Sequence, residues 1–144
     1  FAAPMAEALR AIGSEHVLIV HGAPGLDEIS LCGPTQVTEL RDGDITAYAI
    51  GPDDLGLPPC TPDDIAGGDP ATSAQMLRDV LAGTPGPCLD VVLANAAAAL
   101  VVAGRADTLV AGVATARESV SSGAAAAKLR DLQEFSNRFP AATA

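Results

Sequence analysis

The apolar pattern predicts a short helix followed by a buried strand at the start of the chain. Pro4 can begin the helix, and Gly13 is placed to end it. The apolar positions of this helix recur at helical spacing: Met5, Ala8, Leu9 and Ile12. Residues 16–21 then read HVLIVH, and an apolar run without alternation is typical of a strand covered on both faces of a parallel α/β sheet. Because no strand precedes the helix, we expect the chain to begin inside an α/β domain.

A β-hairpin is predicted next. Residues 28–32 read as a short strand, and residues 36–41 alternate only loosely. The pair Asp42-Gly43 favours a two-residue turn, because both of its positions adopt positive φ readily. Residues 44–50 then form the returning strand.

The remainder of the chain is predicted to be a loop followed by helices. Residues 51–69 are rich in proline and glycine and indicate a surface loop. Four helices follow, over residues 70–82, 89–102, 106–122 and 124–138. The second of them is apolar on every face, which is typical of a central buried helix. The others have apolar stripes, formed by Ala74, Leu77, Val80 and Leu81, by Leu109, Val113, Ala116 and Val120, and by Leu129, Leu132 and Phe135.

Composition places the chain among folded proteins and makes nucleic acid an unlikely partner. The 144 residues are 49% apolar, enough for one domain with a real core. The net charge is -10, and ten of the 18 acids lie between Asp27 and Asp69 with Arg41 as the single base there. Because binding to a phosphate backbone needs clustered Lys and Arg, we expect no nucleic-acid partner.

The chain shows no sign of a membrane or secretory segment. Its longest charge-free apolar stretch, residues 91–103, is shorter than the roughly 20 residues that a bilayer requires. The N-terminal residues lack a basic region and carry Glu7 within their apolar patch, unlike a signal peptide. We therefore expect a cytoplasmic protein without a membrane partner. The three cysteines, Cys32, Cys60 and Cys88, have no metal-binding spacing and are expected to be reduced packing or loop residues.

The stretch with the most chemical information is IVHGAPGLDEISL, residues 19–31. It places a turn with glycine and proline at the carboxyl end of the predicted strand, where open α/β sheets bind ligands. Two adjacent carboxylates, Asp27 and Glu28, follow the turn. Hard oxygen ligands of this kind suit Mg²⁺ when waters and phosphate complete the coordination. By residue types alone, an ordinary solvated turn remains the alternative.

A longer pattern resembles a known family. Residues 4–137 include VHG, GLDEISL, GPT, a Pro-rich loop, GGD, NAAAAL, GRAD and FSN in this order, and they are similar to the C-terminal part of anthranilate phosphoribosyltransferase. The resemblance implies that Asp27 and Glu28 hold magnesium, which bridges the pyrophosphate of phosphoribosyl pyrophosphate. It also places His21 and Gly22 in the matched turn as weaker candidates for substrate binding, with Gly22 allowing close backbone approach.

The resemblance implies a reaction and a fold. The reaction transfers phosphoribosyl from phosphoribosyl pyrophosphate to anthranilate and releases pyrophosphate, in tryptophan biosynthesis. The fold is an α/β domain of the nucleoside phosphorylase/phosphoribosyltransferase type, of which residues 1–144 would be the C-terminal portion: a buried strand and a β-hairpin followed by helices. The family's GTGGD loop, its anthranilate-binding residues and the helical domain through which it forms homodimers do not occur in this sequence. We therefore expect the chain to be inactive without the upstream remainder of the enzyme.

Several positions depart from the family pattern or have a simpler explanation. Pro24 stands where family members often have an acid, and Ser73 stands where they often have Asn. Residues 67–69, GGD, could be mistaken for a phosphate loop, but without a preceding strand or a nearby Lys they favour a helix-capping turn. Asn95, in an otherwise apolar helix, must find hydrogen-bond partners and is expected to be a buried structural tie.

Two alternative functions remain at this point. A pyrimidine nucleoside phosphorylase-like enzyme would share the fold, although it is not expected to share the whole string from GLDEISL to FSN. A non-catalytic paralogue that binds nucleic acid would need a basic groove, and this chain is acidic. The upstream coding sequence would also show whether the chain is one piece of a split polypeptide.

Overall fold

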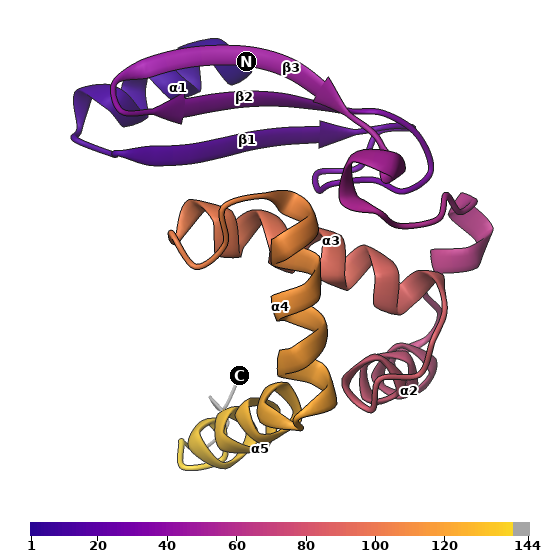
Figure 1. Cartoon of the computed structure of the whole chain (residues 1–144). Coiled ribbons are helices and arrows are strands. Elements are labelled where there is room, and N and C mark those ends of the chain that lie inside the picture. The colour runs from indigo at the N-terminus through magenta and orange to yellow at the C-terminus, as the bar shows by residue number, and fades with distance from the viewer. Residues whose placement is uncertain (140–144) are drawn as a thin grey trace.

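A computed structural model describes residues 1–139 and shows a three-stranded sheet beside a group of helices (Figure 1). The α-helices are α1 (Ala2–Ala11), α2 (Pro70–Leu81), α3 (Pro87–Val102), α4 (Leu109–Ser121) and α5 (Ala124–Ser136). The strands are β1 (His16–Gly22), β2 (Thr35–Arg41) and β3 (Asp44–Ile50), and two 3-10 turns, η1 (Pro52–Leu55) and η2 (Pro62–Ile65), follow them. The mixed α/β architecture expected from the sequence is confirmed.

The sheet is an antiparallel meander in the order β1-β2-β3. Val20 of β1 pairs with Val37 of β2, which pairs in turn with Tyr48 of β3. The predicted turn is confirmed, since Asp42 has φ 51° and Gly43 has φ 89°. The expectation of a parallel pairing for β1 is wrong within residues 1–139, because β2 returns beside it in the opposite direction. Most of β1 is only partly buried, so its apolar run does not reflect complete coverage by these residues.

The segment predicted as a strand over residues 28–32 is instead a bent loop, and β2 begins only at Thr35. Its burial, and not its extended pairing, explains its apolar character, since Ile29 and Leu31 are 1% and 0% exposed. The apolar pattern of this segment therefore predicted its burial in the core correctly, but it predicted a strand where the backbone forms a loop.

Helix α1 packs on the sheet through a different face from the one expected. It contacts all three strands, and Ala6 is its buried residue. Met5 and Ile12, which the helical spacing placed on the inner face, are 52% and 79% exposed. Spacing identifies an apolar stripe, but the stripe on Met5 and Ile12 has no cover within residues 1–139, whereas the small Ala6 permits close approach to the strands.

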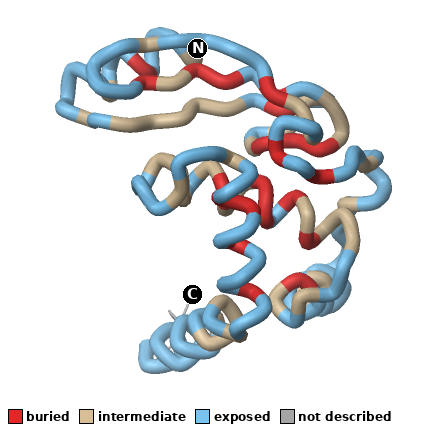
Figure 2. The backbone as a smooth tube through the Cα atoms, viewed as in Figure 1, coloured by how far each residue is buried: buried red, intermediate tan, exposed pale blue. Residues whose placement is uncertain are grey.

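Helix α3 is the centre of the core, as its apolar sequence predicted. Leu93, Ala94 and Ala97 are completely buried on it. Helix α4 crosses α3 at close range: a β-carbon at Gly112 would lie 2.8 Å from the Ala97 carbonyl oxygen. The Pro-rich segment also contributes to this core through Leu55, although a surface loop was predicted there. Figure 2 shows buried positions gathered along β2, the loop after β1 and α3.

Helix α4 buries its predicted stripe through Val113, Ala116 and Val120, whereas α2 and α5 are less buried than their stripes suggested. Asp69 caps α2 and Thr108 caps α4 through side-chain hydrogen bonds to backbone N–H groups. Helix α5 has no residue that the rest of the described chain buries, and Leu132 and Phe135 are 60% and 56% exposed. Among residues 1–139, no helix has the length and apolar character needed to cross a bilayer.

Candidate metal centre

The candidate site lies in the loop that joins β1 to β2, at the carboxyl end of β1. The loop turns back on itself immediately, because the Gly22 carbonyl accepts from Leu26 N–H at 2.7 Å and the Gly22 N–H donates to the Leu26 carbonyl at 2.9 Å. This closed turn places Asp27 and Glu28 directly after it, with bends in the backbone at both residues. Glu28 therefore lies in a bend and does not begin the strand predicted over residues 28–32.

Neither carboxylate of the pair is engaged by a neighbouring cation. Asp27 is exposed and Glu28 is partly buried, and neither takes part in the ion pairs found among residues 1–139. The same residues contain no group of three or more His, Cys, Asp and Glu side chains that could hold a metal alone. Two available carboxylates fit Mg²⁺, which takes hard oxygen ligands and usually completes its coordination with waters and phosphate oxygens.

Buried hydrogen bonds hold the loop behind the carboxylates. Ser30 is completely buried, and its hydroxyl donates to the Ala23 carbonyl and accepts from Cys32 N–H at 2.9 Å. The buried Thr35 hydroxyl accepts from Ser30 N–H at 2.9 Å. Within residues 1–139 no buried side-chain polar atom lacks a partner. The two hydroxyls thus fix both ends of the loop relative to one another.

Gly22 is required by close packing inside the loop. A β-carbon at this position would lie 2.6 Å from the Glu28 carbonyl oxygen and 2.6 Å from Ser30 Cβ. Real β-carbons essentially never come this close to other atoms, so any larger residue would force Glu28 or Ser30 to shift. Within the described residues the backbone that comes close to Gly22 is that of Glu28, and contact of Gly22 with substrate stays a prediction.

Asn95 joins the loop to α3. Its Oδ1 accepts from Ile29 N–H at 2.8 Å, and its Nδ2 donates to the Ile29 carbonyl at 3.0 Å. Nδ2 also donates to the Val91 carbonyl at 3.0 Å, within α3. The expected structural tie is confirmed, but Asn95 is only partly buried, and no feature of the sequence indicates that its partner is the residue next to Glu28. The sequence signal for this role was a single polar side chain in an otherwise apolar helix.

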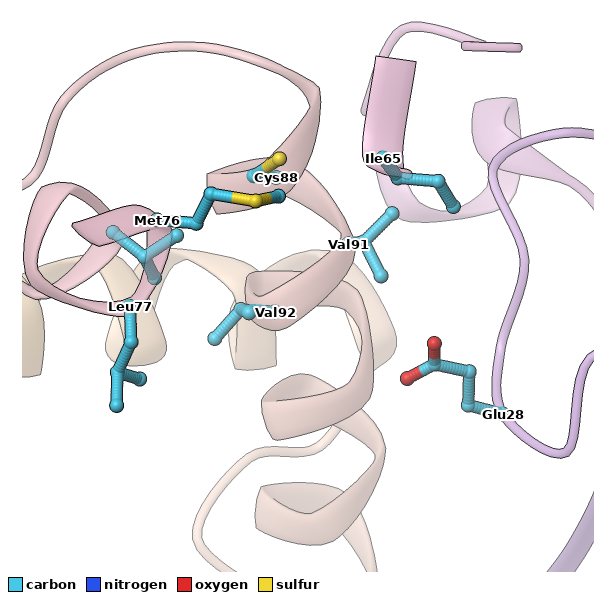
Figure 3. Close-up of a pocket in the computed structure, with 8 residues that line it drawn as sticks. Glu28, Ile65, Met76, Leu77, Cys88, Val91 and Val92 are labelled. Carbon is cyan, nitrogen blue, oxygen red and sulfur yellow. The ribbon is translucent and has the colours of Figure 1, made fainter. Parts of the chain in front are cut away.

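An apolar cavity of about 250 Å³ lies beside Glu28. Its walls are mainly α2 and α3 side chains, including Met76, Val91 and Val92, and among the described residues Glu28 is the single charged one that lines it. Figure 3 shows the Glu28 carboxylate at the edge of this cavity, on the side opposite α2. Glu28 thus has an apolar surface on one side, whereas Asp27 is exposed to solvent.

The remaining candidates lie outside this arrangement or have structural roles. His21 is exposed at the end of β1, opposite Gln36. The GGD segment is a helix cap: Asp69 accepts from Thr72 N–H at 2.8 Å, and this backbone hydrogen bond lowers the pKa of the Asp69 carboxyl. The prediction that residues 67–69 form a capping turn is confirmed.

The three cysteines are free thiols: Cys32 and Cys60 lie in loops, and Cys88 lies in the first turn of α3. The sulfur atoms of Cys32 and Cys60 are 3.5 Å apart, and the Cys88 thiol faces the Asp64 carbonyl. Burial, followed by the contact with Cys32, raises the pKa of the Cys60 thiol to about 11. A thiol with so high a pKa is a poor nucleophile and metal ligand at neutral pH.

A comparison with protein families identifies the class of the chain. Residues 1–126 match the sequence model described as glycosyl transferase family, a/b domain. The chain belongs to this family. Among individual glycosyl transferases, anthranilate phosphoribosyltransferase of Rhodopseudomonas palustris (strain HaA2) is 52% identical over 129 residues, which are 90% of this chain and 38% of that protein. The enzyme of Bradyrhizobium sp. (strain BTAi1 / ATCC BAA-1182) is 51% identical over 93% of this chain and 40% of its own length.

Solved structures of the same enzyme share the fold of this glycosyl transferase chain. Anthranilate phosphoribosyltransferase from Thermus thermophilus has a TM-score of 0.75 and 41% identity over 85% of this chain and 36% of that chain. The Saccharomyces cerevisiae enzyme in complex with PRPP and Mg has a TM-score of 0.79 and 28% identity over 93% of this chain and 38% of that chain. The resemblance read from the sequence is confirmed, and the chain spans about two fifths of the length of the relatives it matches.

Proposed function

We propose that the chain is part of an anthranilate phosphoribosyltransferase. In the proposed reaction, the amine of anthranilate attacks the anomeric carbon of phosphoribosyl pyrophosphate, and pyrophosphate leaves. The observation that carries the proposal is the pair Asp27 and Glu28, which form no ion pair within residues 1–139 and follow a loop tied down by buried hydrogen bonds. The named relatives, at 52% and 51% identity, support this choice of reaction over a nucleoside phosphorylase.

Asp27 and Glu28 would hold a magnesium ion in this proposal. When bound, such an ion supplies positive charge that stabilises the negative charge developing on the departing pyrophosphate. The two carboxylates would position the ion and would not transfer protons. The exposed Asp27 faces solvent, where a diphosphate can approach, and Glu28 borders the apolar cavity. His21 and Gly22 remain weaker candidates for contact with substrate.

The proposed partners include the rest of the enzyme. The chain spans 38% of the Rhodopseudomonas relative, so most of the substrate-binding surface would come from other segments. Two features of the chain support such a partner: β1 is an edge strand of the described sheet, and the apolar residues Met5 and Ile12 of α1 are exposed. Homodimerisation of the complete enzyme is part of the same proposal.

The test follows the loss of anthranilate fluorescence in the full-length enzyme that contains this chain, with phosphoribosyl pyrophosphate and a magnesium titration. We expect magnesium-dependent turnover that falls about ten-fold or more in Asp27→Asn. Asp44→Asn, which removes an exposed carboxylate at the start of β3, is the matched control and should leave turnover unchanged. Equal activity of Asp27→Asn and wild type at every magnesium concentration would contradict the assignment of the metal site. Turnover of a pyrimidine nucleoside with phosphate, and none of anthranilate, would favour the rival enzyme.

A further inference from the structure

The side chain of Asn95 acts on the peptide next to Glu28, although the two lie far apart in the sequence. Asn95 is 66 residues from Ile29, and its amide engages both backbone polar groups of Ile29 at 2.8 and 3.0 Å. A neighbouring strand would satisfy the same two groups in a sheet, but this segment is a bent loop. The amide therefore replaces the strand partner that the loop lacks among the described residues.

The helix that carries Asn95 is well suited to hold the loop in place. Asn95 is fixed to its own helix by the hydrogen bond from Nδ2 to the Val91 carbonyl. Its neighbour Ala94 is completely buried, as is Leu93 one position earlier. Because packed helices resist displacement, the two hydrogen bonds to Ile29 anchor the loop to a tightly packed part of the core.

The Ile29 N–H belongs to the same peptide group as the Glu28 carbonyl. This group is confined on two sides, because Asn95 accepts from its N–H and the Gly22 backbone lies against its carbonyl oxygen. Small displacements of this peptide would move the Glu28 side chain, because the Glu28 Cα that carries it is bonded to the carbonyl carbon of this peptide group. We propose that Asn95 is a positioning residue that fixes Glu28 for magnesium binding; this inference rests on the proposed function.

Only an amide meets the requirements of the position. Asn presents one acceptor and two donor hydrogens, and the structure uses the acceptor and both donor directions. An aspartate at position 95 keeps the acceptor and the shape but loses the donors, and an alanine loses both. In Asn95→Asp a carboxylate oxygen would also face the Ile29 and Val91 carbonyl oxygens, acceptor against acceptor, so both variants should weaken metal binding.

The test measures metal binding directly in the full-length enzyme. Free Mn²⁺ is followed by electron paramagnetic resonance in the presence of pyrophosphate, with Mg²⁺ as competitor. We expect both Asn95→Ala and Asn95→Asp to weaken metal binding about ten-fold. In turnover assays the magnesium concentration for half-maximal rate should rise by a similar factor, while the KM for anthranilate changes less than about two-fold.

The control is Val120→Ala, a core truncation on α4 beside Gly83, remote from the loop. It should lower stability without changing metal affinity. Unchanged metal affinity in both Asn95 variants, with a loss in Asp27→Asn, would overturn the inference and leave the proposed function intact. Unchanged affinity in Asp27→Asn as well would contradict the proposed metal site itself. Failure of both Asn95 variants to fold, while Val120→Ala folds, would assign Asn95 to the core and also overturn the inference.

Discussion

Gly22 lies against the backbone of Glu28 so closely that a β-carbon would be 2.6 Å from the Glu28 carbonyl oxygen. This contact joins the last residue of β1 to one of the two candidate metal ligands. If the metal site depends on this contact, adding a single methyl group at position 22 should impair it.

We therefore expect Gly22→Ala to displace Glu28 and to lower magnesium-dependent turnover of the full-length enzyme about ten-fold or more. Overpacking of this kind typically costs about 1–3 kcal/mol of stability. Gly51→Ala is the matched control, because apart from its two chain neighbours no described residue lies within 4 Å of a β-carbon there, and its φ of -127° suits any residue. Turnover and urea denaturation of the two variants measure both effects, and identical behaviour of the pair would refute the packing argument.

A second glycine tests the core and not the site. At Gly112 a β-carbon would lie 2.8 Å from the Ala97 carbonyl oxygen and 2.9 Å from Ala97 Cα. Gly112→Ala should therefore force α3 and α4 apart and lower the free energy of unfolding by about 1–3 kcal/mol, despite the higher helix propensity of alanine. The same Gly51→Ala control applies, and a stabilised Gly112→Ala protein would show that the crossing is looser than described.

Tyr48 gives a spectroscopic prediction for the sheet. Burial, followed by the hydrogen bond that its hydroxyl donates to Glu39 at 2.8 Å, raises the pKa of Tyr48 from 10.0 to about 12. Because the folded chain favours the neutral phenol, this contribution to stability is complete below pH 10 and is lost as the pH rises through about 12.

Tyr48 is the single tyrosine of the 144 residues, which contain no tryptophan, so absorbance at 295 nm reports its ionisation directly. We expect a midpoint near 12 for the folded chain and a lower one for Glu39→Gln. Asp131→Asn on α5 removes an exposed carboxylate elsewhere and should not move the midpoint. An unshifted wild-type midpoint, with circular dichroism still native, would contradict the Tyr48–Glu39 interaction.

The cysteines give a prediction of selective reactivity. The raised pKa of Cys60, about 11 against an ordinary 9.0, lowers its thiolate fraction about 100-fold near pH 8, and alkylation depends on the thiolate. Cys60 should therefore react slowly with iodoacetamide, at a rate that keeps increasing up to about pH 11. Cys32→Ser, which removes the neighbouring thiol, should accelerate the reaction. Peptide mass spectrometry at a series of pH values measures the rates, and rapid labelling of Cys60 at pH 8 would contradict the prediction.

The sequence predicted individual turns and helix caps better than it predicted which elements pack against one another. The turn at Asp42-Gly43 and the cap at Asp69 were predictable because each depends on residues within a few positions. The antiparallel pairing of β1 was not, because an apolar strand carries no mark of its direction. The inner face of α1 was also missed, since nothing among residues 1–139 covers Met5 and Ile12.

The candidate site divides in the same way. Asp27 and Glu28 were visible as adjacent acids after a glycine turn, and the resemblance assigned them a role. The contacts that support them were not visible, because Asn95 and Ile29 are 66 residues apart and Gly22 packs against backbone. The sequence identifies charged residues directly, whereas the hydrogen bonds that hold a loop in place depend on the three-dimensional arrangement.

The contacts of the meander join residues close in sequence, whereas the hydrogen bonds of Asn95 join residues far apart in sequence. This difference in sequence separation implies an order of folding. Each strand pairs with its neighbour in sequence, so the sheet closes only short loops, which form quickly. The hydrogen bonds from Asn95 to Ile29 close a loop of 66 residues and need α3 to be docked first. We therefore expect the strands to form early and the loop that carries Asp27 and Glu28 to become ordered last, so that a partly folded chain would have a sheet but no metal site.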